Sequence, residues 1–170
     1  MTTPSDGPER QLLAALTLLV ADWASVATQE AIARRAGVDV DPVDVQPLYA
    51  LGQLGPQRAS ALADTLRLSR PTMSKQLRRL TEAGLVEREP DPGDARASTL
   101  SLSARGREAY DRLVREGITI VHAALAEWDA AGTDAFARDL SRFVSALAVD
   151  GGAGKQPSAA GPAAPEKKKR

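Results

Sequence analysis

The chain contains no cysteine among its 170 residues and a single histidine, His122. A chain without cysteine forms no disulfide and holds no metal or redox centre through thiolates. One histidine leaves no basis for a histidine-rich metal site or for a Ser-His-Asp or Cys-His catalytic set, and neither a P-loop nor a G-x-G-x-x-G segment is present. The sequence therefore predicts a protein that is not an enzyme and that needs no metal or cofactor.

Aromatic residues are also scarce, with two Trp, two Tyr and two Phe, so the core is expected to consist mainly of Leu, Val and Ala. No apolar run approaches the roughly 18 residues that span a bilayer. The first ten residues, "MTTPSDGPER", lack the basic start and apolar segment of a signal peptide. We therefore expect a cytoplasmic protein.

The composition of the last twenty residues differs from that of the rest of the chain. Residues 151–170 are rich in Gly, Ala and Pro and end in "EKKKR", a composition that buries too little apolar surface to offset its ordering entropy. We predict disorder for 1–8 and 151–170 and one domain over 9–150, which is long enough for one core. Two interpretations of the basic tail stay open: added non-specific DNA affinity through counterion release, or a solubilising or cloning-derived extension.

A net charge of zero conceals a segregation of charge along the chain. Residues 56–107 hold ten basic and six acidic residues, whereas 1–55 hold three and seven and 108–150 hold four and eight. A local basic face can bind phosphate even when the whole protein is neutral. Before residue 151 the basic residues are sixteen Arg and one Lys, which suggests a GC-rich bacterial genome.

Hydrophobic periodicity predicts a mainly α-helical chain with a small β-hairpin. The hairpin comprises strands at Leu85–Glu89 and Ser98–Ser103, joined by the turn-rich segment "PDPGDARA". The helices are expected at 9–36, around Leu48 and Leu51, within 58–68, after Ser69, at 104–130 and at 133–149.

Two short helices followed by a hairpin form a winged helix-turn-helix, here at about 45–103. Ser69 is a good N-cap for the second helix, and Pro71 is tolerated in its first turn. That helix turns Met73, Leu77 and Leu80 to one side and polar residues to the other. The major groove of B-DNA admits one helix, and Arg or Lys there can read guanine. The candidate DNA contacts are Ser69, Arg70, Pro71, Thr72, Ser74, Lys75, Arg78 and Arg79; the alternative is an ordinary solvated helix face.

The hairpin loop would be the wing. Arg96 suits the minor groove, where narrow A-tracts have an enhanced negative potential, and Asp94 could hold Arg96 by a charge-assisted bond. The alternative is a surface ion pair that contributes little.

The segment "LADTLRLSRPTMSKQLRRLTEAGLVEREPDPGDARASTLSLSARGR" resembles the core of the MarR family of bacterial transcription regulators. The wing pattern Asp-Pro-x-Asp-x-Arg is its most specific part, and the resemblance extends over about residues 48–110. It implies a homodimer in which the terminal helices, here about 9–36 and 104–149, interlock, while two winged domains bind a pseudo-palindrome. The long apolar stripes of those helices independently favour burial against a second copy.

Two departures from the family pattern stand out. The family often has consecutive arginines in its wing, but Ala95 occupies the first of these positions. The connector "DVDPVDVQP" at 39–47 is longer and richer in proline than usual. Because the family's effector pocket borders this connector, the resemblance leaves the shape of the pocket open.

The sequence thus predicts a DNA-binding transcription regulator, a ligand-responsive repressor that acts on double-stranded DNA as a homodimer. Trp23, Tyr49 and His122 are candidate residues for a small-molecule effector, and packing in the core or dimer interface is the alternative for each. The competing function is a winged-helix module for protein interaction without specific DNA binding, in which the basic face is incidental.

Overall fold

The computed structural model describes residues 7–91 and 94–150, with the side chains of 91, 94–97 and 148–150 left out of the description. The chain is grouped into two compact units, Met1–Ala124 and Leu125–Arg170, and each is described by itself. Of the ends predicted to be disordered, 1–6 and 151–170 lie outside the described residues, whereas Pro8 already begins a helix. The domain boundaries given by the sequence stay predictions.

The fold class is the predicted one: mainly α-helical with a small antiparallel sheet. The first unit contains α1 (Pro8–Trp23), α2 (Val26–Arg35), the 3-10 helix η1 (Pro42–Asp44), α3 (Val45–Leu54), β1 (Gln57–Arg58), α4 (Ala59–Thr65), α5 (Arg70–Glu82), β2 (Val86–Asp91), β3 (Asp94–Leu102) and α6 (Ala104–Ala124). The second unit contains α7 (Ala130–Asp150).

The single helix predicted over 9–36 is wrong, because the chain forms two helices, α1 and α2, that are bent by 58° relative to each other. The Ser25 side chain accepts a hydrogen bond from the Thr28 amide at 3.1 Å and so starts a new helix. This N-cap stabilises a helix start where the apolar periodicity runs on without interruption. Among the described helices, none is by itself long and apolar enough to cross a membrane, and only the bent pair α1 and α2 passes that test together.

The two helices predicted at 104–130 and 133–149 are present, but the first ends earlier, at Ala124. Trp128 therefore lies in the segment before α7, and its ring packs against Phe136 with ring centroids 5.3 Å apart. Asp129 Oδ1 accepts a hydrogen bond from the Gly132 amide at 2.7 Å. This bond satisfies one of the free amides at the start of α7.

The sheet has the strand order β1-β3-β2 and is antiparallel throughout. The predicted hairpin is confirmed, with Val86 opposite Leu102, but its strands extend further into the segment expected to be a loop. The two-residue strand β1 was not predicted, because it is too short to show a period. Along β3, Leu100 and Leu102 are buried, as the alternation predicts.

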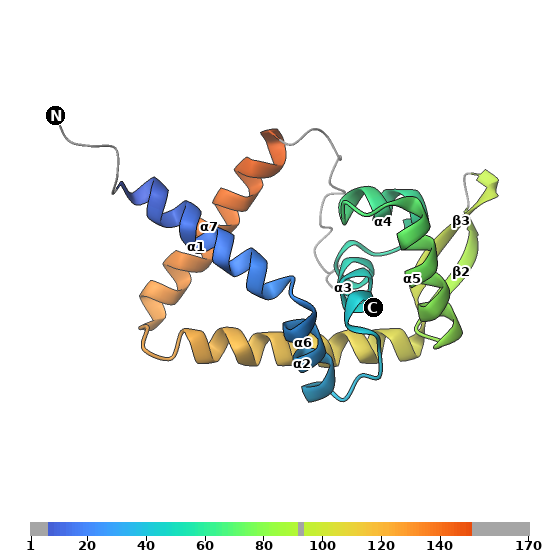
Figure 1. The fold of residues 1–170 in the computed structure, drawn as a ribbon, viewed down its shortest axis with the longest axis horizontal. Coiled ribbons are helices and arrows are strands. Elements are labelled where there is room, and N and C mark those ends of the chain that lie inside the picture. Colours follow the sequence, from blue (N-terminus) through green and yellow to red (C-terminus); the bar gives the residue numbers. More distant parts are fainter. Residues whose placement is uncertain (1–6, 92–93, 151–170) are drawn as a thin grey trace, which may run out of the picture. The chain divides into compact units, whose positions relative to one another are not determined.

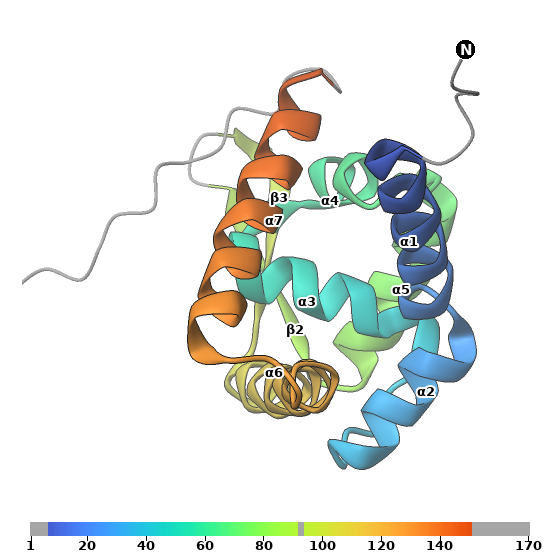
Figure 2. The ribbon, with the colours of Figure 1, turned by 90° about the vertical axis from the view of Figure 1, so that its left-hand side faces the viewer.

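The core of the first unit lies between α3, α4, α5, the sheet and α6. Figure 2 shows α3 running between α4 and α6, and residues of α3 contact both helices. Leu48, Leu51, Leu62, Leu77, Leu100 and Leu113 are fully buried there. The start of α6 comes so close to the segment between α5 and β2 that a Cβ atom on Gly106 would lie 1.9 Å from the Leu85 carbonyl oxygen. This close approach requires glycine at the start of α6.

Candidate nucleic-acid interface

The helix-turn-helix consists of α4, the turn 66–69 and α5, and the β2–β3 hairpin lies beside α5 (Figure 1). In the turn, Arg67 has a φ of 53°, and the Leu68 amide donates to the Ala63 carbonyl at 2.9 Å. Ser69 is the N-cap of α5, as predicted, and its Oγ accepts a hydrogen bond from the Thr72 amide at 3.2 Å. Pro71 occupies the first turn. Ser69 and Pro71 together therefore determine where α5 begins.

The apolar side of α5 is buried and its polar side is exposed, as the sequence predicts. Met73, Leu77 and Leu80 are each at most 1% exposed. The exposed candidates for DNA contact are Ser69, Arg70, Pro71, Thr72, Ser74, Lys75 and Arg78. These side chains project from one helix that is fastened to the domain by its opposite side, which is the presentation that a recognition helix requires.

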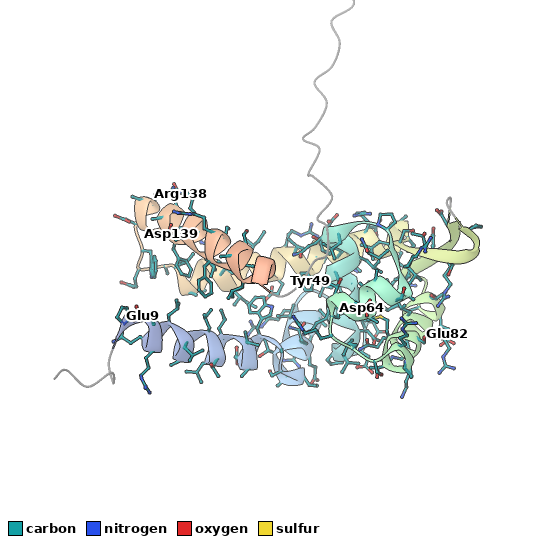
Figure 3. The ribbon with its side chains drawn as sticks, turned by 90° about the horizontal axis from the view of Figure 1, so that it is seen from above. Glu9, Tyr49, Asp64, Glu82, Arg138 and Asp139 are labelled. Carbon is teal, nitrogen blue, oxygen red and sulfur yellow. The ribbon has the colours of Figure 1, made fainter. Side chains whose placement is uncertain are left out.

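Three cations of this polar side are available to a ligand. Arg70 and Lys75 form no ion pair with any side chain that the structure describes. Arg78 Nε lies 3.8 Å from Glu82 Oε1, with both side chains about two-thirds exposed; Figure 3 shows Glu82 on α5. Such an exposed pair contributes little, so phosphate can compete with Glu82 for Arg78. The amino end of α5 adds a partial positive charge.

Arg79 differs from the other candidates, because its guanidinium is held by an acid from another element. Its Nε and Nη2 donate to the two carboxylate oxygens of Asp44, at 2.7 and 2.5 Å. Asp41 Oδ2 lies 4.0 Å from Arg79 Nε. The Asp44 side chain is 2% exposed, and that of Arg79 is 30% exposed. The structure therefore places Arg79 in an ion pair with a buried acid, whereas Arg70 and Lys75 form none with the side chains that the structure describes.

The ionisation of this pair follows from its burial and its contacts. Burial raises the pKa of the Asp44 carboxyl above its ordinary value, while the hydrogen bond and charge of Arg79 act in the opposite direction. The hydrogen bond that Arg79 donates to Asp44 is the main cause that raises the pKa of Arg79. Arginine is protonated in any case, so Arg79 is a permanent cation opposite a buried acid.

Gln76 is a second polar residue of α5 that contacts the segment before α3. The sequence analysis did not identify Gln76 as a candidate. It is 5% exposed, and its Nε2 donates to the Val43 carbonyl at 2.7 Å. Gln76 and Arg79 thus both bind the segment 41–44, which lies more than 30 residues earlier in the chain. No local pattern relates residues so far apart.

The wing candidates Asp94 and Arg96 have side chains outside the described part of the structure. The backbone of both belongs to β3, beside the turn of the hairpin. Their roles in DNA binding stay predictions.

Two of the three effector candidates line one cavity of about 400 Å³, which also contacts Gln29, Gln46, Leu54 and Leu66. These two are Trp23 and Tyr49. Tyr49 donates its hydroxyl to the Leu113 carbonyl at 2.8 Å, and its ring meets that of Tyr110 edge-on with centroids 6.0 Å apart. Burial raises the pKa of Tyr49, which keeps the phenol neutral. His122 is exposed on α6 and does not line this cavity.

The part of the chain that the structure describes contains no group of three or more His, Cys, Asp or Glu residues placed to hold a metal ion. Asp41 and Asp44 both face Arg79 of α5. The exposed side of α5 offers cations and hydroxyls for binding.

Comparison with known proteins agrees with this geometry. The MarR family profile matches residues 38–97. The HTH-type transcriptional regulator YxaD of Bacillus subtilis (strain 168), itself uncharacterised, is 27% identical over 100 residues, which cover 59% of this chain and 70% of YxaD.

Solved structures show the same fold. A MarR family protein from Bacillus stearothermophilus superposes with a TM-score of 0.68 at 17% identity, over 84% of this chain and 99% of the other. NadR in complex with 4-hydroxyphenylacetate gives a TM-score of 0.56 at 20% identity, over 84% and 96% of the two chains. The segment 38–97 thus matches the MarR family profile, and the chain has the fold seen in a solved MarR family protein.

Proposed function

We propose that this protein is a homodimeric, ligand-responsive transcription repressor that binds a pseudo-palindromic operator in double-stranded DNA. The observation that carries the proposal is the exposed polar side of α5, where Arg70, Lys75 and Arg78 project from a helix whose other side is buried. Because it acts on bacterial DNA, we place it in the cytoplasm.

On the operator, α5 enters the major groove. Lys75 and Arg78 stand three residues apart on its exposed side, where each can reach a base edge or a phosphate. Ser69, Arg70, Pro71, Thr72 and Ser74 surround the amino end of the helix, where partial positive charge favours phosphate. Arg96, supported by Asp94, contacts the adjacent minor groove from the wing.

Dimerisation supplies the second recognition helix. No residue of α1 is buried, and Leu13, Leu18 and Val20 are each at least 64% exposed. In the second unit, Phe136, Val144 and Leu147 of α7 are between 45% and 57% exposed. Apolar surface of this extent is unusual on a monomer, and a second copy of the chain covers it most simply. The two α5 helices would then read half-sites about 10 base pairs apart.

The cavity beside Trp23 and Tyr49 is the proposed effector site. Its volume of about 400 Å³ lies within the range of small-molecule pockets, and both aromatic and amide side chains line it. NadR, which has this fold, was solved with the aromatic acid 4-hydroxyphenylacetate, and we expect a ligand of similar size here. A ligand that favours a spacing of the two α5 helices incompatible with the operator would release the DNA by population shift.

Selection of bound fragments from the host genome tests this function. The purified chain should enrich fragments that share an inverted repeat with half-sites about one turn of DNA apart. The doubly substituted variant Lys75→Ala/Arg78→Ala is the matched control and should enrich none. Recovery of no common sequence, or equal recovery by the control, would contradict the proposal.

A further inference from the structure

The connector at 39–47, which carries Pro42 and Pro47, contacts α5 directly. Its 3-10 helix η1 packs against α5, and two side chains of α5 bind it. Gln76 Nε2 donates to the Val43 carbonyl at 2.7 Å, and Arg79 donates twice to Asp44. Asp41 orders the connector itself, because its Oδ1 accepts from the Val43 amide at 3.1 Å.

These contacts restrain α5 in a way that its core packing does not. Met73, Leu77 and Leu80 attach the helix through apolar contact, which is non-directional. A guanidinium that shares two parallel hydrogen bonds with a carboxylate is directional, because both groups are planar. Gln76 directly follows Lys75 in the sequence, and Arg79 directly follows Arg78. A rotation or slide of α5 that moved Lys75 and Arg78 in the groove would therefore break the bonds to the connector.

We propose that Asp44, Gln76 and Arg79 form a connector clamp that positions α5 for specific DNA binding, with Arg79 as a positioning residue and not a phosphate contact. This inference rests on the proposed DNA-binding function. The connector clamp also links α5 to α2, because η1 packs against α2 as well. The connector thus contacts both α2 and the proposed recognition helix.

The effect of neutralising Asp44 on DNA affinity distinguishes this proposal from the alternative, in which Arg79 binds a DNA phosphate. If Arg79 binds phosphate, Asp44 competes with DNA for it, and the Asp44→Asn variant should bind DNA more tightly. If Arg79 positions α5, the same variant loses the two-point contact and should bind its operator more weakly. The matched control is Glu82→Gln, which removes an acid on α5 that pairs only loosely with Arg78. The control should bind DNA as tightly as the parent or more tightly.

The experiment titrates full-length parent, Asp44→Asn and Glu82→Gln against a duplex recovered by the genomic selection and against a random-sequence duplex. We expect Asp44→Asn to lose about tenfold in affinity for the selected duplex, since hydrogen bonds to charged groups contribute on that order. Its affinity for random duplex should stay that of the parent. Selected-duplex binding by folded Asp44→Asn that equals or exceeds that of the parent would overturn the connector clamp.

The Arg79→Lys variant keeps the proposal testable if Asp44→Asn fails to fold. Lysine retains the charge but not the paired planar donors, and Arg79 is partly exposed, so this variant should stay folded, as thermal unfolding will check. We expect it to lose affinity for the selected duplex while the slope of log affinity against log salt stays unchanged; parental affinity would overturn the connector clamp. If the parent itself binds no duplex at low salt, the proposed function fails and this inference falls with it.

Discussion

The Ser69 hydroxyl closes the first turn of α5 on Thr72: its Oγ accepts the Thr72 amide at 3.2 Å and lies 2.7 Å from Thr72 Oγ1. Both residues are exposed candidates for DNA contact. The same hydroxyl that begins α5 therefore also orders the end of the helix that we propose faces phosphate.

Replacement of Ser69 by alanine should destabilise the protein by about 1 kcal/mol, because an N-cap amide loses its acceptor. Ser69→Asp is the matched control, since aspartate is an equally good cap but brings a negative charge toward DNA. Thermal unfolding should show a lower melting temperature for Ser69→Ala only, whereas DNA titration should show weaker binding for both. An unchanged melting temperature for Ser69→Ala would contradict the capping role.

Lys75→Ala and Arg78→Ala should each weaken operator binding. If either side chain reads a base, the cost should be roughly 1–3 kcal/mol and vary with operator sequence; a phosphate contact should instead give a uniform cost and a salt slope smaller by about 1. Arg34→Ala is the control, because Arg34 is an exposed cation on α2 in a loose pair with Glu30. Titration against operator variants distinguishes these outcomes, and parental affinity in both α5 variants would refute the proposed interface.

The double variant Leu13→Glu/Leu18→Glu should dissociate the proposed dimer. The two leucines are 67% and 71% exposed on α1, and a charge buried in an apolar interface is costly. Sedimentation velocity should show a monomer for this variant and a dimer for the parent and for Arg34→Glu. A dimeric double variant would place the interface elsewhere.

The carboxyl of Asp44 should titrate above its ordinary pKa of 3.8, because burial outweighs the opposing contacts with Arg79. A raised pKa means that the folded state holds the proton more tightly than the unfolded chain does. The contribution of Asp44 to the free energy of unfolding is therefore fully present below the unfolded pKa and is lost as pH rises through the folded pKa. Asp44→Asn should remove this part of the pH dependence in denaturant unfolding. NMR titration of the parent carboxyl checks the direction, and a midpoint below 3.8 would contradict it.

The winged helix-turn-helix could be predicted because its signals are local. Ser69 as a cap, Pro71 in the first turn, and the spacing of Met73, Leu77 and Leu80 lie within one helix. The alternation about Leu100 likewise identified a strand. Each of these patterns depends on neighbours a few residues apart, which is the range over which periodicity and capping act.

The features that were not predicted depend either on contacts between distant segments or on a cap that the apolar pattern conceals. The break at Ser25 lies within an uninterrupted apolar pattern, so periodicity alone extended the helix across it. Arg79 looks like its neighbour Arg78 in sequence, and only the buried Asp44, 35 residues earlier, distinguishes them. His122 was grouped with Trp23 and Tyr49 by residue type, but α6 presents it to solvent away from their cavity.

The central claim is that the polar side of α5 binds duplex DNA, and the salt dependence of affinity measures this most directly. The purified parent should bind the selected duplex with a log affinity that falls linearly against log salt, with a slope of about −0.9 for each phosphate neutralised. Lys75→Ala/Arg78→Ala should bind more weakly and with a shallower slope. Absence of binding by the parent even at low salt, or an affinity indifferent to salt, would contradict the account.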